Sequence, residues 1–160
     1  MQILNVGAGR TDEEYRAAEE QRRADLRADS RSDANYFFIA AAVAALGSGL
    51  TPVQLNILAN VGVIDLLQHY SGAFGELHIL AVYATTALWL VLLTGLGFAA
   101  QKGYRWAFLV GIVLYVMDMG ALAVMFSTWS TGVHGFFVYR WFQGQKALKE
   151  LKELAHAEKQ

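Results

Sequence analysis

Apolar residues fill the middle of this chain, and charged residues gather at its two ends. Between Tyr36 and Phe142, the formally charged residues are Asp65, Glu76, Lys102, Arg105, Asp118 and Arg140. A soluble domain of this size has too little polar surface to cover such a stretch, whereas a bilayer covers it directly. The pattern therefore predicts an all-α fold, a polytopic membrane helical bundle formed by residues 35–142.

Two segments are each long enough to cross a bilayer alone, because a transmembrane helix needs about 20 apolar residues. They are residues 78–100 and 106–127. Two shorter apolar segments, about 35–50 and 130–143, complete a predicted set of four transmembrane helices. The last one runs into the charged tail, so we expect a single long helix that leaves the membrane near Arg140.

The amphipathic pattern of residues 52–68 predicts one more helix, with Thr51 as its N-cap and Pro52 at its first helical position. The distribution of Lys and Arg favours a re-entrant or interfacial helix on the outer side, because basic residues collect on the cytoplasmic side. Basic clusters precede the first span, occupy the turn at 101–105 and follow the last span. Four spans then place both termini in the cytoplasm. The alternative is that 52–68 packs fully within the bundle.

The two ends of the chain predict polar helices outside the membrane. Residues 1–34 form an N-terminal arm, in which a helix is expected from Asp12 to about Asp29 behind a Thr11–Glu14 capping box. Residues 143–160 form a charged C-terminal helix. The N-terminal helix can serve as a docking arm for a partner or for lipid headgroups, or it can simply be a solubilising helix.

Composition excludes several classes of function. The net charge is −1, which gives no basic field for nucleic acid. The chain has no cysteine, so thiol catalysis, disulfides and thiolate metal sites are excluded. The polar start predicts no cleavable signal peptide. No catalytic signature is present, since Gly47-Ser48-Gly49 with His134 is a weak match to a serine hydrolase and suits close helix packing better.

Asp118 is the most informative residue, because it falls near the middle of the span 106–127. Carboxylates at that depth usually face the bundle interior and have partners. The expected partners are Thr85, Thr86 and Thr94 on the preceding helix, Ser48, or Asn56 and Asn60 if the helix at 52–68 dips inward. No basic residue is expected at that depth. Asp118 is either a proton or cation site or a polar contact that fixes the register of the helices.

Three histidines, His69, His78 and His134, fall on the predicted outer side of the membrane. Neutral imidazole is the commonest protein ligand for metals, so these three residues are candidates for a metal or haem site. Their spacing matches no known ligand pattern. Histidines at helix ends are also commonly interfacial residues with no ligand.

The C-terminal half carries a pattern that resembles a known type of protein. The stretch Gly103–Gly111 is followed by Leu114, Tyr115, Asp118 and then His134. It is similar to small uncharacterised bacterial membrane proteins that have four spans and a lysine-rich C-terminal tail. The resemblance implies a bacterial inner membrane and no particular activity.

Three functions remain open. The first is an accessory or scaffolding subunit of a membrane complex, or a homo-oligomer, whose partners are the lipid bilayer and other membrane subunits. The second is a small proton- or ion-coupled transporter or channel centred on Asp118. The third is a haem- or metal-binding membrane protein that uses the outer-side histidines.

Overall fold

The computed structural model describes residues 12–50, 62, 64, 77–124 and 128–157. These residues form four helices and no strands, which confirms the all-α prediction. The helices are α1 (Asp12–Leu50), α4 (Leu77–Gln101), α5 (Arg105–Val124) and α6 (Thr128–Ala157). The predicted segments 78–100 and 106–127 correspond closely to α4 and α5. Both helices are long and apolar enough to cross a membrane, over Ile79–Gln101 and Arg105–Ala123.

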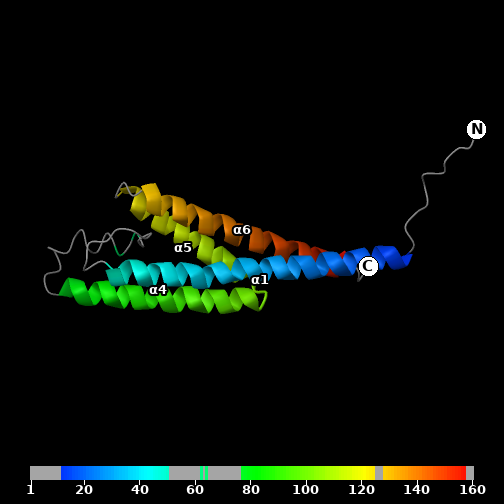
Figure 1. Cartoon of the computed structure of the whole chain (residues 1–160), viewed down its shortest axis with the longest axis horizontal. Coiled ribbons are helices and arrows are strands. Elements are labelled where there is room, and N and C mark those ends of the chain that lie inside the picture. The colour runs from blue at the N-terminus through cyan, green and yellow to red at the C-terminus, as the bar shows by residue number, and fades with distance from the viewer. Residues whose placement is uncertain (1–11, 51–61, 63, 65–76, 125–127, 158–160) are drawn as a thin grey trace, which may run out of the picture.

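The helices form an antiparallel bundle (Figure 1). Helix α1 packs against α4 and α6, and α5 packs against α6 and α4. The end of α1 and the start of α4 lie at one end of the bundle (Figure 1), and the turn between α4 and α5 lies toward the other.

Helix α1 is longer than the sequence predicted. We expected a helix from Asp12 to about Asp29 and a separate span at 35–50, whereas one helix of 39 residues covers both. The linking residues Ser30–Ala34 contain no glycine or proline to break a helix. A continuous buried stripe also crosses them, so tertiary packing favours an unbroken helix there.

Each helix is buried along a stripe whose positions alternate by three and four residues, the spacing of a left-handed coiled-coil seam. On α1 the stripe consists of Arg23, Leu26, Ser30, Asp33, Phe37, Ala40 and Ala44. On α5 it consists of Phe108, Gly111, Tyr115, Asp118 and Leu122. On α6 it consists of Ser130, His134, Phe137, Trp141, Gly144, Leu148 and Leu151. Several polar residues therefore lie inside the bundle, where a simple seam would be apolar.

The centre of the bundle is aromatic. The ring of Phe37 stacks on Trp141, with centroids 4.1 Å apart, and it contacts Phe108 at 5.8 Å. Gly111 makes this possible, because a Cβ there would lie 2.5 Å from a ring carbon of Phe37. Tyr115 packs edge-on against Trp141 at 4.7 Å and continues the aromatic column along α5.

A glycine ends helix α4 and forms part of the turn to α5. Gly103 has a φ of 84°, in the left-handed region. Its amide donates to the Ala100 carbonyl at 2.9 Å, and the Tyr104 amide donates to the Ala99 carbonyl at 3.1 Å. This is the Schellman arrangement, which ends a helix and reverses the chain within a few residues.

The outer surface of the bundle is strongly apolar. Large apolar side chains on all four helices point outward, and we call this surface the apolar belt: Ile39, Leu46, Leu80, Leu88, Val91, Phe98, Leu109, Val113, Val116, Met117, Phe136 and Phe142. Beyond the belt, α6 runs beside α1, and the first turns of α1 extend past the end of α6 (Figure 1). We call residues 12–33 of α1 and 143–157 of α6 the polar hairpin. The single long helix predicted at the C-terminus is confirmed as α6.

The predicted helix 52–68 lies outside the described residues except at two positions. Gly62 and Ile64 are helical and buried. Ile64 packs in a small apolar cluster with Ala44 of α1 and Val82 of α4. At these two positions the segment is therefore packed against the bundle.

Candidate functional site

Asp118 is buried in the core of the bundle, where the stripe on α5 faces α6. Its side chain has no exposed surface, and its Oδ2 lies 2.8 Å from Nε2 of His134. The His134 side chain is 4% exposed. Both residues lie on the buried stripes of their helices, so the packing of α5 against α6 brings them together.

The other nitrogen of His134 settles which tautomer is present. Nδ1 lies 2.8 Å from the backbone carbonyl oxygen of Ser130, one turn earlier on α6. A carbonyl oxygen only accepts, so Nδ1 carries a hydrogen and donates it. Nε2 is then an acceptor in the neutral ring. Nε2 faces Oδ2 of Asp118 at 2.8 Å, so these two atoms can hold one proton between them.

A third group completes the site. The backbone amide of Gly62 donates to Oδ2 of Asp118 at 2.9 Å. A Cβ at position 62 would lie 2.6 Å from the backbone oxygen of Asp118 and 2.9 Å from Cγ of Leu122. Glycine is thus the residue that allows this segment to approach α5 closely enough for the amide to reach the carboxyl group.

Aromatic rings enclose the acid–histidine pair. Tyr115 stacks on the imidazole of His134, with centroids 4.6 Å apart. The rings of Trp89 and Trp141 contact Tyr115 at 6.1 Å and 4.7 Å. Such a dry surrounding strengthens polar contacts and raises the cost of leaving either partner alone.

The structure brings to Asp118 a partner that the sequence did not suggest. We expected no basic residue at that depth, and this was wrong because His134 lies on α6 at the same level. Thr86 is buried, and its hydroxyl donates to the Val82 carbonyl one turn earlier, at 2.8 Å. Thr85 is only half-buried on the next face of α4. Asn56 and Asn60 lie outside the described residues.

The three histidines suggested for a metal or haem are not assembled by the described part of the chain. His69 lies outside it, and of His78 only the backbone, in the first turn of α4, is described. Both ring nitrogens of His134 already face oxygen atoms. Within the described ranges, no group of three His, Asp, Glu or Cys side chains could hold a metal ion. The side chain of Ser48, considered for a hydrolase, also lies outside them.

A second buried polar contact, which the sequence did not reveal, joins α1 to α6. Asp33 Oδ1 lies 2.6 Å from Nη2 of Arg140, and the Asp33 side chain is 5% exposed. The guanidinium carbon of Arg140 sits 4.7 Å from the ring centroid of Tyr36, a cation–π geometry. Burial raises the pKa of Asp33 above its ordinary value, and the positive charge of Arg140 offsets part of that rise.

Further contacts hold the polar hairpin together. Arg22 of α1 forms an ion pair with Glu150 of α6. Arg23 donates to the backbone carbonyl of Leu154 at 3.4 Å and bonds to Glu19 one turn earlier. These side chains are partly exposed, so each contact contributes little to stability alone. Together they connect the two helices along the hairpin.

The fold and the site define a helical bundle with an apolar outer surface and a buried acid–histidine pair. No known protein family, curated protein or solved structure matches this chain.

Proposed function

We propose that the chain is a multi-pass integral membrane protein, in which all four helices cross the bilayer. The apolar belt carries this proposal. Leu80, Leu88, Val91 and Met117 are each at least 66% exposed, whereas Asp118 is buried. A protein in water buries large apolar side chains and does not present a continuous apolar surface of this extent. A bilayer removes that surface from water.

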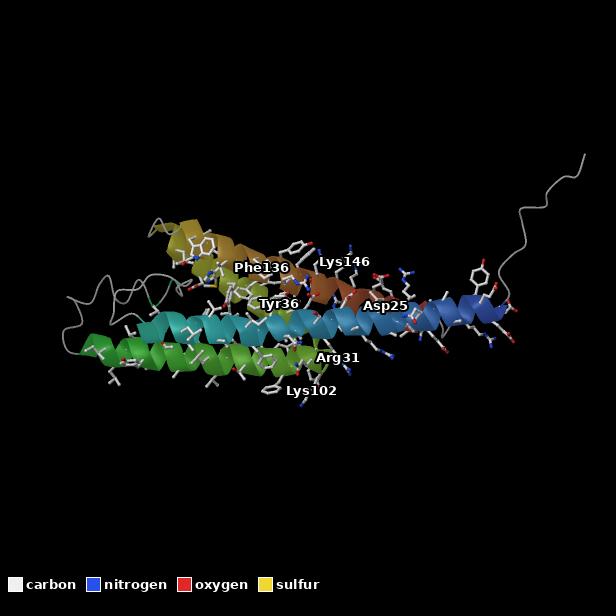
Figure 2. All side chains as sticks on the ribbon, in the orientation of Figure 1. Asp25, Arg31, Tyr36, Lys102, Phe136 and Lys146 are labelled. Carbon is white, nitrogen blue, oxygen red and sulfur yellow. The ribbon has the colours of Figure 1, made fainter. Side chains whose placement is uncertain are left out.

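The arrangement of basic residues supports one orientation. Arg31 of α1, Lys102 of the α4–α5 turn and Lys146 of α6 lie at one level along the bundle axis (Figure 2), and we call these three residues the basic band. Tyr36 and Phe136 lie on its inner side, toward the apolar belt (Figure 2). Basic residues next to aromatic residues are typical of the cytoplasmic interface. We therefore place the polar hairpin in the cytoplasm, and by resemblance in the cytoplasm of a bacterium.

For this membrane protein we propose the role of an accessory or scaffolding subunit. The polar hairpin is the feature that supports it. The hairpin is an ordered structure rather than two loose tails, and most of its side chains on α1 are exposed. A rigid, charged helical pair held at the membrane surface suits the docking of another membrane subunit or of a second copy of the chain.

Labelling in the membrane tests the topology. The chain has no native cysteine, so single cysteines can replace Lys102, Glu153 and Trp129 without background. A membrane-impermeant maleimide should label positions 102 and 153 in inverted vesicles, and position 129 in right-side-out vesicles. Labelling of 102 and 153 from opposite sides would contradict the four-span topology.

Co-purification tests the role. Native mass spectrometry of the protein, extracted from its own membrane in mild detergent, should show a larger complex or a homo-oligomer. Charge reversal of hairpin residues that face solvent, such as Arg27→Glu with Arg16→Glu, should release the partner while leaving the helical content unchanged. A parent chain that is always a lone monomer would remove the scaffold proposal.

The acid–histidine pair supports a second candidate, proton- or ion-coupled transport. A buried acid and a histidine 2.8 Å apart can exchange a proton, and such pairs form proton relays within membranes. Proteoliposomes with a pH-sensitive dye measure this directly. Parent vesicles should transport protons, and both Asp118→Asn and His134→Asn should abolish the flux, while Gly120→Ala should leave it unchanged. Absence of flux in the parent would remove this candidate and leave the scaffold proposal intact.

A further inference from the structure

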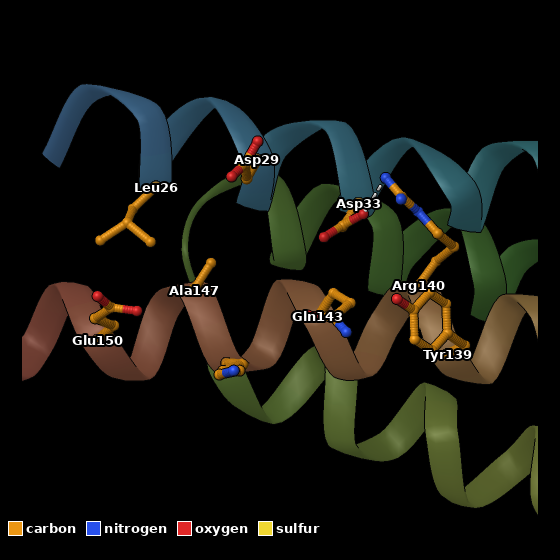
Figure 3. Close-up of a pocket in the computed structure, with 9 residues that line it drawn as sticks. Leu26, Asp29, Asp33, Tyr139, Arg140, Gln143, Ala147 and Glu150 are labelled. Carbon is orange, nitrogen blue, oxygen red and sulfur yellow. Dashed lines mark ion pairs between the residues drawn. The ribbon is translucent and has the colours of Figure 1, made fainter. Parts of the chain in front are cut away.

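A cavity of about 390 Å³ lies between α1 and α6 at the base of the polar hairpin (Figure 3). Asp29 and Asp33 line it from α1, and Tyr139, Arg140 and Lys146 line it from α6. It therefore extends from the edge of the apolar belt, at Tyr139, into the charged hairpin. None of the candidate functions named for the chain uses it.

Most of the charges around the cavity already have partners. Arg140 contacts Asp33 at 2.6 Å, and Glu150 pairs with Arg22. Among the described residues, Asp29 and Lys146 have no hydrogen-bond or ion-pair partner. They stand on opposite walls of the cavity, one on each helix. The cavity thus presents one uncompensated negative charge and one uncompensated positive charge.

This charge pattern selects a class of ligand. Three acidic residues and two basic residues line the cavity, namely Asp29, Asp33, Glu150, Arg140 and Lys146. A ligand with only negative charge would be repelled by the acidic side chains. A zwitterion suits both walls, with its cationic group at Asp29 and its phosphate at Lys146.

The chemistry of the cationic group can be narrowed further. Tyr139 is the one aromatic residue that lines the cavity, and quaternary ammonium groups are recognised by cages of several aromatic rings. Carboxylates recognise a primary ammonium instead, because it donates three hydrogen bonds. The cavity therefore suits ethanolamine phosphate better than choline phosphate.

The position of the cavity indicates that this group belongs to a lipid. Lys146 is part of the basic band, at the level expected for headgroups (Figure 2). Tyr139 is 57% exposed, and it borders both the cavity and the apolar belt. Acyl chains attached to a bound headgroup could therefore lie against the belt.

We propose that this cavity binds the headgroup of a zwitterionic phospholipid with a primary ammonium, phosphatidylethanolamine. The proposal rests on the membrane placement proposed above. The lipid would join α1 to α6 at the base of the polar hairpin, through Asp29 on one helix and Lys146 on the other.

Native mass spectrometry of the full chain in detergent tests the proposal. The protein is titrated with phosphatidylethanolamine, phosphatidylcholine and phosphatidylglycerol that carry identical acyl chains. We expect phosphatidylethanolamine to bind about tenfold more tightly than the other two lipids. Asp29→Asn should remove most of this preference, whereas Lys146→Gln should weaken the binding of all three lipids, because each of them carries the phosphate. Both side chains are exposed, so thermal unfolding should show that the fold is retained.

Lys149→Gln is the matched control, because Lys149 pairs with Glu153 at 3.6 Å and does not line the cavity. It should leave the preference unchanged. Equal binding of the three lipids to the parent would overturn the proposal. A Lys149→Gln variant that loses the preference as strongly as Asp29→Asn does would overturn it too.

Water-soluble glycerophosphoethanolamine separates this proposal from the membrane proposal. Binding of this molecule as tight as that of the lipid would overturn a lipid source, even if the chain is in the membrane. Conversely, the labelling experiment can place the chain in the membrane while the chain shows no preference for phosphatidylethanolamine. That result overturns the headgroup site alone.

Discussion

His134 of α6 contacts Asp118 of α5 through a single nitrogen, with Nε2 2.8 Å from Oδ2. The second nitrogen is held by the Ser130 carbonyl on the same helix. The imidazole is thereby fixed in one orientation and one tautomer. The contact consequently defines how α5 and α6 are aligned along their length, as buried polar residues in helical seams often do.

Removal of the carboxyl group should destabilise the bundle. Asp118→Ala removes a partner of Nε2 of His134 and of the Gly62 amide, and both groups are buried. Each buried polar group left without a partner lowers the free energy of unfolding by about 1–3 kcal/mol. Asp118→Asn should cost less but not be neutral. A single amide atom cannot both donate to His134 and accept from Gly62, so one of the two contacts is lost. Thermal unfolding in detergent measures both variants.

The expected order of stability is parent, then Asp118→Asn, then Asp118→Ala. An Ala variant as stable as the parent would show that the contact with His134 does not hold the helices together.

Two glycines on α5 should respond in opposite ways to alanine. At Gly111 a Cβ would lie 2.5 Å from Phe37, so Gly111→Ala should destabilise by about 1–3 kcal/mol through overpacking. At Gly120 nothing lies within 4 Å of the new Cβ. Gly120→Ala should stabilise by about 0.5–1 kcal/mol, because alanine loses less backbone entropy in a helix. Unfolding by heat or denaturant compares the two directly.

If both alanine variants were destabilised equally, the packing of Phe37 over α5 would not be as described.

The burial of Asp33 should make stability depend on pH. Burial raises the pKa of Asp33 in the folded protein, so the folded state binds this proton more tightly than the unfolded chain does. The stabilisation is complete below the unfolded pKa of about 3.9 and is lost as pH rises through the folded pKa. The melting temperature of the parent should fall over that window relative to Asp33→Asn, which has no proton to lose.

If the difference in melting temperature between the parent and Asp33→Asn stayed constant with pH, the raised pKa of Asp33 would be contradicted. Lys149→Gln, an exposed change far from Asp33, serves as the control for general effects of charge.

The ion pair between Arg22 and Glu150 should be weak but specific. Arg22→Glu places two like charges together and should loosen the polar hairpin. The double variant Arg22→Glu with Glu150→Arg should restore it. Because the side chains are 60% and 30% exposed, we expect a coupling of about 0.2–1 kcal/mol, which weakens as salt rises. A double-mutant cycle measured at low and high salt detects the coupling, and no recovery in the double variant would exclude it.

The sequence predicted the positions of the apolar helices, but it did not predict which residues of neighbouring helices contact one another. The spans 78–100 and 106–127 were clear because each has a full bilayer length of apolar residues, and this signal is local. The continuity of 12–29 with 35–50 was not predicted, because the first segment is polar and the second is apolar. The linking residues Ser30–Ala34 nevertheless contain no glycine or proline. The three-and-four spacing of buried positions runs through this region, and it could have revealed the continuous helix.

The candidate site was predicted in part. Asp118 was identified because a carboxylate within an apolar span is unusual, but its partner depends on how two helices align. His134 could have been placed beside it, since the spacing from His134 to Phe137 to Trp141 puts the histidine on the buried stripe of α6. Asp33 carried no local signal, because it lies at the edge of a charged segment and its burial results from packing against Arg140.

The unbroken course of α1 has a mechanical consequence. At about 1.5 Å per residue, a helix of 39 residues is a stiff rod about 58 Å long, and more than half of it lies beyond the apolar belt. Because no glycine or proline lies between the two parts, a tilt of the half inside the apolar belt moves the outer half with it, together with the part of α6 that is bonded to α1. A tilt of about 10° would move a tip about 30 Å away by about 5 Å. A small rearrangement around Phe37 would thus become a larger displacement at Asp12.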